Sequence, residues 1–238
     1  MVNLIKNEVY KIIKKKSTSI MLSIWIVVII IQMYKTKDTF LEISTDFSVI
    51  NVLLTIFSAS ILTEEFSKRT IKFLLIKPHT RAEILLAKLI SLFSITLALD
   101  ILQLILCFII DIAQTQNTAI DANLLFRLLT NIFAQILYIT FTIFVSLFAR
   151  SQGLAIAGSI VVIFFGSLLN ALLVSQFDLW IVAINPLNMF NITLLNISAE
   201  NDAYLLPFWQ YALGIVIYSS LFYYLTNLFF KRRDIVFS

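Results

Sequence analysis

The chain has few of the residues that build catalytic centres, metal sites and tight turns. Its 238 residues include one cysteine, one histidine, four glycines and three prolines. A single cysteine, Cys107, excludes an intramolecular disulfide. A single histidine, His79, excludes any metal or catalytic site that needs two of them. Scarce glycine and proline argue against a β-barrel, which needs many turns, and favour a helical fold.

Charge is scarce as well. Only 13% of the residues are charged, 60% are hydrophobic, and the mean hydropathy is +0.93. A water-facing surface cannot carry so much apolar area without sticking to other chains. Long apolar runs exclude the alternative of a soluble protein with a large core. We therefore expect an all-α integral membrane protein, folded as a single domain over residues 1–238.

The apolar runs predict six transmembrane helices. Each has the roughly 17–25 residues that cross about 30 Å of hydrocarbon, and the third and fourth are longer. The expected spans are Thr18–Tyr34, Phe47–Thr63, Ile84–Ile110, Asn123–Ala149, Gly153–Val174 and Pro207–Phe230.

Residues 1–17 form a short amphipathic segment before the first span. Val2, Ile5, Val9 and Ile12 fall on one helical face, and the lysines fall elsewhere. This pattern predicts a helix that lies in the membrane interface. A signal peptide does not fit, because no small-residue cleavage site follows and further spans do.

Basic residues predict the orientation. With the N-terminus inside, the inner segments hold all of the 18 lysines and arginines except Lys35, Lys37 and Arg127. This asymmetry follows the positive-inside rule and places both termini in the cytoplasm. A pI near 9.1 therefore reflects the inner membrane surface, and we expect no nucleic-acid partner.

The longest outer loop, residues 175–206, contains the apolar sequence NPLNMFNITLL. A plain solvated loop would be more polar. We expect a short helix at or dipping into the outer interface, with Asn185 as its cap and Pro186 in its first turn.

Polar residues form a stripe on each of two neighbouring spans. The stripes are Thr96, Asp100, Gln103, Cys107 and Asp111 on the third span, and Arg127, Asn131, Gln135, Tyr138, Thr142 and Ser146 on the fourth. Antiparallel packing would pair Asp111 with Arg127 as a structural contact, and would bring Asp100 to Tyr138. A buried acid must face protein or water. Hydrogen bonds between helices are one interpretation, and a translocation or gating site at Asp100, Gln103, Gln135 and Tyr138 is the other.

Small residues in the fifth span, Gly158, Ser159 and Gly166, allow close helix contact. They fit a dimer seam or ordinary packing within the chain.

One segment, Glu64–Lys88, is strongly charged in this apolar chain. It includes a cytoplasmic loop, residues 64–83, that is longer than a tether requires. IKFLLI predicts a short amphipathic helix that Pro78 ends, and Thr80 with Glu83 has the capping-box pattern. Such a helix either rests on lipid headgroups or docks into a groove of a cytosolic partner.

The order of residues in this segment resembles the region after the second span of type-2 ABC exporter permeases. The matching positions are Glu64, Glu65, Ser67, Thr70, Ile71, Lys72, Leu74, Leu75, Pro78, Thr80, Arg81, Ile84 and Lys88. The match departs at Arg69, where glycine is common. The predicted topology and NPL at Asn185–Leu187 are also similar to that family.

The resemblance implies that the segment is a coupling helix that docks on a separate ATP-binding subunit. The docking residues would be Lys68, Arg69, Lys72, Phe73, Leu74, Leu75 and Lys77. It further implies two ATPase copies, which carry ATP and magnesium, and a second permease copy or a paralogue. The Ile-, Lys- and Asn-rich composition indicates a bacterial cell membrane. Exporters of phenol-soluble modulins and peptide antibiotics are similar, so the expected cargo is an amphipathic peptide or another hydrophobic molecule.

No enzyme activity is expected of the chain itself. It has no G-x-x-x-x-G-K-[ST] phosphate-binding loop, and it carries no cofactor of its own. EEFSKR matches the first motif of CAAX-type intramembrane proteases, but the histidines of their later motifs are missing. The alternative to transport is a six-span scaffold or sensor whose loop binds lipid or a regulator.

Overall fold

The computed structural model of the chain describes residues 1–35, 47–67, 80–113, 122–149, 151–176, 185–196 and 206–232. Within these ranges all regular elements are helical. In chain order they are α1 (Val2–Lys14), α2 (Lys16–Lys35), α4 (Ser48–Ser67), α6 (Arg81–Ala113), α7 (Ala122–Phe148), α8 (Gln152–Gln176), α10 (Pro186–Met189), the 3-10 helix η1 (Phe190–Asn196) and α11 (Phe208–Arg232). The prediction of an all-helical chain is thus confirmed over the described ranges.

The six long helices fall on the six predicted apolar stretches, with ends that differ by a few residues. Within the described residues, four helices are long and apolar enough to cross a membrane, namely α4, α6, α7 and α11. The apolar parts of α2 and α8 are shorter, at Lys16–Ile31 and Gln152–Ile163. Four membrane-spanning helices are therefore supported by length and composition, and the count of six stays a prediction.

Helix α6 has polar residues inside and apolar residues outside. Thr96, Asp100, Gln103 and Cys107 are all buried, as the stripe predicted. On the other side of the helix, Ile101, Ile105, Ile109 and Ile112 are each more than half exposed. A soluble bundle would reverse this arrangement, so the outer surface of α6 suits hydrocarbon and not water.

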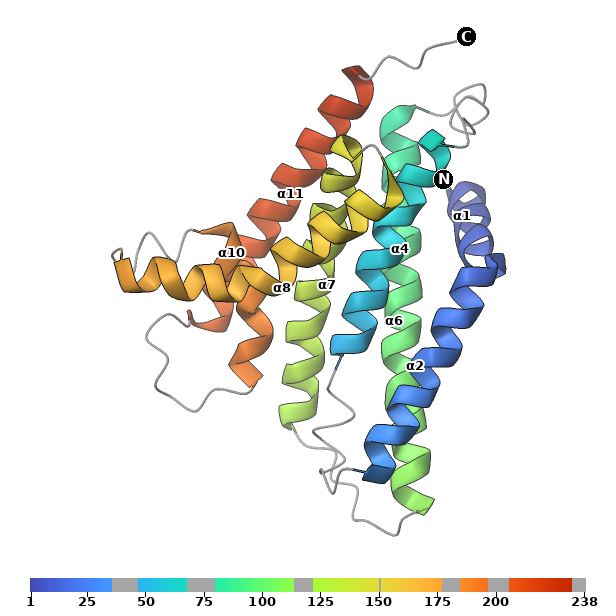
Figure 1. Cartoon of the computed structure of the whole chain (residues 1–238), viewed down its shortest axis with the longest axis vertical. Coiled ribbons are helices and arrows are strands. Elements are labelled where there is room, and N and C mark those ends of the chain that lie inside the picture. The colour runs from blue at the N-terminus through green and yellow to red at the C-terminus, as the bar shows by residue number, and fades with distance from the viewer. Residues whose placement is uncertain are drawn as a thin grey trace.

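Helix α4 forms the centre of the bundle. It contacts α6, α7 and α8, and Ile50, Leu54, Ala59 and Leu62 along it are fully buried. In Figure 1, α2, α4, α6 and α7 run close to the long axis, whereas α8 crosses the view obliquely. The buried share of the apolar window is larger in α4 and α7, at 61% and 56%, than in α6, at 33%.

One end of the bundle gathers several chain segments. Figure 1 shows α1, the end of α4, the start of α6 and the end of α11 together at the top. Arg81 Nη1 donates hydrogen bonds to the carbonyl oxygens of Phe230 and Lys231, at 2.8 and 2.9 Å. Positive charge at a helix C-terminus stabilises the exposed carbonyl groups there. The start of α1 and the end of α11 thus lie at the same end of the bundle as the end of α4 and the start of α6 (Figure 1), and the cytoplasmic location of this end stays a prediction.

The buried face of α1 differs from the predicted one. The structure buries Leu4, Glu8 and Ile12, whereas Val2 is 65% exposed. An acid was not expected in a buried face, because its charge must be compensated. The compensating lysines, described below, come from α1 itself and from α6.

The predicted short helix after the fifth span exists. Asn185 Oδ1 accepts a hydrogen bond from the Leu187 backbone at 3.0 Å, and Pro186 starts α10. This segment lies deeper in the bundle than expected, because Phe190 stacks on Tyr138 with ring centroids 5.6 Å apart. Tyr138 lies 16 residues into α7, about 24 Å along its axis.

Small residues of α8 serve contacts within the chain. A side chain at Gly158 would meet Val145 of α7, and one at Gly166 would meet Leu187 and Phe190. These contacts support ordinary packing within the chain as the role of the two glycines.

Candidate functional site

The predicted docking residues, Lys68 to Lys77, lie outside the described residues. The structure does describe both ends of that segment. Before α6, Thr80 and Glu83 cap each other: the Thr80 backbone donates to Glu83 Oε2 at 3.1 Å, and the Glu83 backbone donates to Thr80 Oγ1 at 3.2 Å. The predicted capping box is confirmed, and it sets where α6 begins.

An ionic cluster joins the end of α4, the start of α6 and α1. Lys88 Nζ lies 2.6 Å from Glu65 Oε1 and 2.8 Å from Glu8 Oε2. Lys11 Nζ lies 2.7 Å from Glu8 Oε1 and 3.6 Å from Glu65 Oε1. Lys15 pairs with Glu64 in a close contact beside this group. We call Glu8, Lys11, Glu65 and Lys88 the ionic cluster.

Burial makes this cluster unusual. Lys88 is fully buried, Glu8 is 2% exposed and Glu65 is 9% exposed. Each buried charge therefore needs an opposite charge, and the four charges balance. The second oxygen of Glu65 has no hydrogen-bond donor among the described residues.

The pKa values of two cluster residues reflect their partners. Burial raises the pKa of the Glu8 carboxyl, but the charge of Lys88 and the hydrogen bonds from Lys11 and Lys88 hold it, on balance, below its ordinary 4.5. Burial lowers the pKa of the Lys11 ammonium, yet its contacts with Glu8 and Glu65 leave it above its ordinary 10.5. Both groups are thus ionised around neutral pH.

Sequence reasoning did not find this cluster. It assigned Glu64, Glu65 and Lys88 only to the family-like motif, and it counted Lys11 among the lysines off the apolar face. One signal was present: Glu8 lies four residues after Leu4 and four residues before Ile12, within one helical face. An acid in such a place requires a basic partner.

A second polar group lies in the middle of the bundle. The Asp100 carboxylate accepts two hydrogen bonds from Gln135 Nε2, at 3.0 and 2.9 Å, and one from Asn131 Nδ2 at 3.4 Å. Asn131 Oδ1 accepts in turn from Asn51 Nδ2 at 3.1 Å. We call Asn51, Asp100, Asn131 and Gln135 the amide network; it joins α4, α6 and α7.

The structure brings together some of the predicted intramembrane residues and not others. Asp100 and Gln135 are bonded, and Gln103 is buried one turn along α6. The predicted contact of Asp100 with Tyr138 is wrong: Asp100 bonds to Gln135, three residues earlier in α7, and Tyr138 stacks on Phe190. The prediction counted residues from an assumed pair, so an axial offset of about 4.5 Å escaped it.

The assumed pair was Asp111 with Arg127. Arg127 is half-buried near the start of α7, and the side chain of Asp111 lies outside the described part of the chain. This pair therefore stays a prediction.

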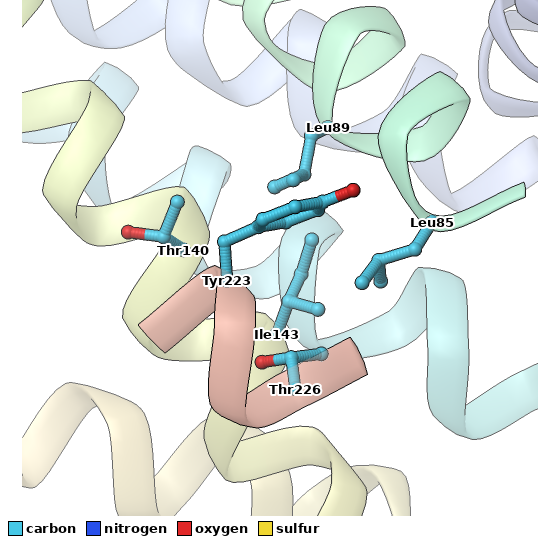
Figure 2. A pocket seen from close by; sticks show the side chains of 6 residues that line it. All are labelled: Leu85, Leu89, Thr140, Ile143, Tyr223 and Thr226. Carbon is cyan, nitrogen blue, oxygen red and sulfur yellow. The ribbon is translucent and has the colours of Figure 1, made fainter. Parts of the chain in front are cut away.

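A crevice of about 140 Å³ lies between α6, α7 and α11. Figure 2 shows the ring of Tyr223 directed across it toward Leu85 and Leu89, with Ile143, Thr140 and Thr226 on the remaining sides. The interior has no space for a water molecule. This crevice is too narrow to hold cargo in the conformation described.

The described residues hold no group of three His, Cys, Asp or Glu side chains that could bind a metal ion. The site therefore consists of the ionic cluster at one end of the bundle and the amide network in its middle.

A comparison with protein families identifies the chain. The family described as ABC-2 family transporter protein matches residues 42–235. This match covers most of the chain, which therefore belongs to the ABC-2 transporter family, the membrane subunits of ABC transporters. A search among curated proteins finds no match.

Proposed function

We propose that this chain is the permease half of a bacterial ABC exporter, and that a separate subunit hydrolyses ATP. The family match carries this proposal, because it spans the predicted docking segment and the helices on both sides of it. Two copies of the permease, or one copy and a paralogue, would pair with two ATPase subunits. Both chain termini would lie in the cytoplasm.

The geometry around the docking segment supports docking. Residues 68–79 leave α4 just after Glu65 and enter α6 just before Arg81. The Glu65–Lys88 ion pair and the Arg81 bonds to α11 hold these two ends. A partner that pushes on a segment with firmly held ends moves the attached helices, whereas a loosely held loop would absorb the motion.

We further propose that the cargo is an amphipathic peptide or a comparable hydrophobic molecule. The amide network supports a gating role for the polar residues between α6 and α7. It ties α6 to α7 and α4 through hydrogen bonds between buried side chains. Separation of these helices would expose Asp100, Gln103, Gln135 and Tyr138 to the opening between them.

The first test is to co-express the chain with ABC ATPases from its own host and to purify the complex in mild detergent. Phe73→Asp places a charge on the proposed apolar anchor, and Phe73→Leu is the matched control that keeps it apolar. We expect Phe73→Asp to lose the ATPase and Phe73→Leu to retain it. If Phe73→Asp keeps both the ATPase and transport, the docking assignment is wrong.

The cargo is tested on the same complex. ATP turnover that rises with added amphipathic peptide supports peptide export, and a complex without that response removes the peptide from the proposal. A chain that captures no ATPase at all supports the scaffold or sensor instead.

A further inference from the structure

We call residues 68–79 the docking segment. The ionic cluster lies at its base, where the chain leaves α4 and enters α6. Glu65 is in the last turn of α4, before residues 68–79, and Lys88 is two turns into α6, after them. Their ion pair, 2.6 Å long, closes the base of the segment. The same ammonium group lies 2.8 Å from Glu8, and Lys11 of α1 lies 3.6 Å from Glu65, so α1 is attached to both sides of this base.

Two contacts fix the position of α1 along α6. Leu4 packs with Ile84 and Ala87 in an apolar cluster beside the ion pairs. Glu8, one turn further along α1, meets Lys88, one turn further along α6 than Ile84. A slip of α1 along α6 would break both contacts together, because each depends on the same register.

The buried charges also oppose separate motion of the three helices. Such a cluster adds little net stability compared with apolar side chains of similar volume, but removal of one partner leaves a buried charge uncompensated. Displacement of α1 alone would separate Glu8 from Lys88. Displacement of α4 alone would separate Glu65 from Lys88. The lowest-energy motion therefore carries α1 and both ends of the segment together.

We propose that Lys88, with Glu8 and Glu65, makes α1 part of the unit that passes motion of the ATPase to the membrane helices. This inference rests on the proposed function. The three residues are positioning residues, because they act through the segment that docks. A purely structural role would change only the amount of folded protein, whereas the proposed role changes how docking affects ATP turnover.

The test uses three variants of the full chain in complex with its ATPase. Lys88→Met keeps an unbranched side chain that is one atom shorter, and it removes the charge. Lys6→Met is the matched control, because Lys6 is exposed on α1 outside the cluster. Glu8→Lys, Lys11→Glu, Glu65→Lys and Lys88→Glu in one chain exchange all four charges, so every ion pair of the cluster still joins opposite charges.

Two measurements are made on each variant. The first compares ATP turnover of the complex with turnover of the free ATPase, at equal amounts of bound ATPase. The second is the disulfide yield between cysteines introduced as Leu4→Cys and Ala87→Cys, with Cys107→Ala to remove the native thiol. The disulfide reports the attachment of α1 without any ATPase.

We expect Lys88→Met to reduce both the effect of the permease on turnover and the disulfide yield by about tenfold or more, with the ATPase still bound. Lys6→Met keeps both values, and the charge exchange restores most of each. If Lys88→Met folds poorly, the charge exchange decides alone: a well-folded exchange variant without the effect on turnover overturns the proposal.

Other results would also overturn it. Normal turnover and disulfide yield in Lys88→Met mean that the cluster does not hold α1. Loss of the disulfide with normal turnover means that Lys88 holds α1 in place but that this attachment takes no part in coupling. A wild-type chain that binds no ATPase overturns the proposed function and the coupling role. The disulfide yields of the wild type and of Lys88→Met still show whether the cluster holds α1 on α6.

Discussion

The ionic cluster and the amide network compensate buried charge in different ways. At the end of the bundle, two carboxylates face two ammonium groups and the charges balance. In the middle, the Asp100 carboxylate is held by neutral amide donors, and no basic side chain pairs with it among the described residues. Opposite charges attract over several ångströms, whereas amide hydrogen bonds need close and aligned contacts. The amide network is therefore the more sensitive to small movements.

The largest effect is expected from Gln135→Leu, which removes two of the three hydrogen bonds to Asp100. The carboxylate would stay buried with little compensation, so stability should fall by about 3 kcal/mol or more. Thermal unfolding in detergent measures the loss. Asp100→Leu with Gln135→Leu is the control, and it should be more stable than Gln135→Leu alone because no buried acid remains. Equal stability of the two variants would show that the network does not hold the carboxylate.

Acid should release the ionic cluster. The folded pKa of Glu8 lies below its ordinary 4.5. A lowered pKa contributes stability above 4.5, and this contribution is lost as the pH falls through the folded value. The stability of the chain, measured by thermal unfolding in detergent, should therefore keep the contribution of Glu8 from pH 7 to 5 and lose it as the pH falls below 4.5. Glu8→Gln should lose less stability than the wild type over the same fall in pH, and an equal loss in the two chains would contradict the prediction.

The contact of Gly214 with Met189 involves no charge, so it allows the cost of a packing change alone to be measured. A methyl group at Gly214 of α11 would overlap the Sδ of Met189, which is buried. Gly214→Ala should therefore cost about 1–3 kcal/mol, because Met189 must move within a filled interior. Gly153→Ala is the control, since nothing lies near its position and alanine favours a helix. Thermal unfolding compares the two variants, and a more stable Gly214→Ala would refute the close contact.

The smallest effect is expected at the capping box. Thr80→Ala removes the hydroxyl that accepts the Glu83 N–H, and it should cost about 1 kcal/mol. Thr80→Ser keeps an oxygen in that place and should behave as wild type. Hydrogen exchange at the first turn of α6 is the most direct measurement. Equal protection in both variants would mean that the ionic cluster alone holds this end.

Patterns within single helices predicted much of this fold. Apolar length placed the six long helices, and helical spacing identified the buried faces that contain Asp100, Gln103 and Gln135. Local chemistry predicted the Thr80–Glu83 box and the Asn185 cap, because these contacts join residues three or fewer positions apart.

Contacts between distant helices were harder to predict. The pairing of Asp100 with Gln135 depends on the axial offset of α6 and α7, which periodicity does not contain. Lys88 with Glu8 joins residues 80 positions apart, and the position of α1 on α6 decides that pair. The depth of Phe190 depends on space between α7, α8 and α11, for which no local signal exists.

The position of the Asp100 donors has a consequence for how the chain enters the membrane. Synthesis proceeds from the N-terminus, so the Asp100 carboxylate is made before Asn131 and Gln135, which lie 31 and 35 residues later. A lone α6 in lipid would hold a buried carboxylate without its donors, and this costs several kcal/mol. We therefore expect α6 and α7 to enter the bilayer together as one hairpin.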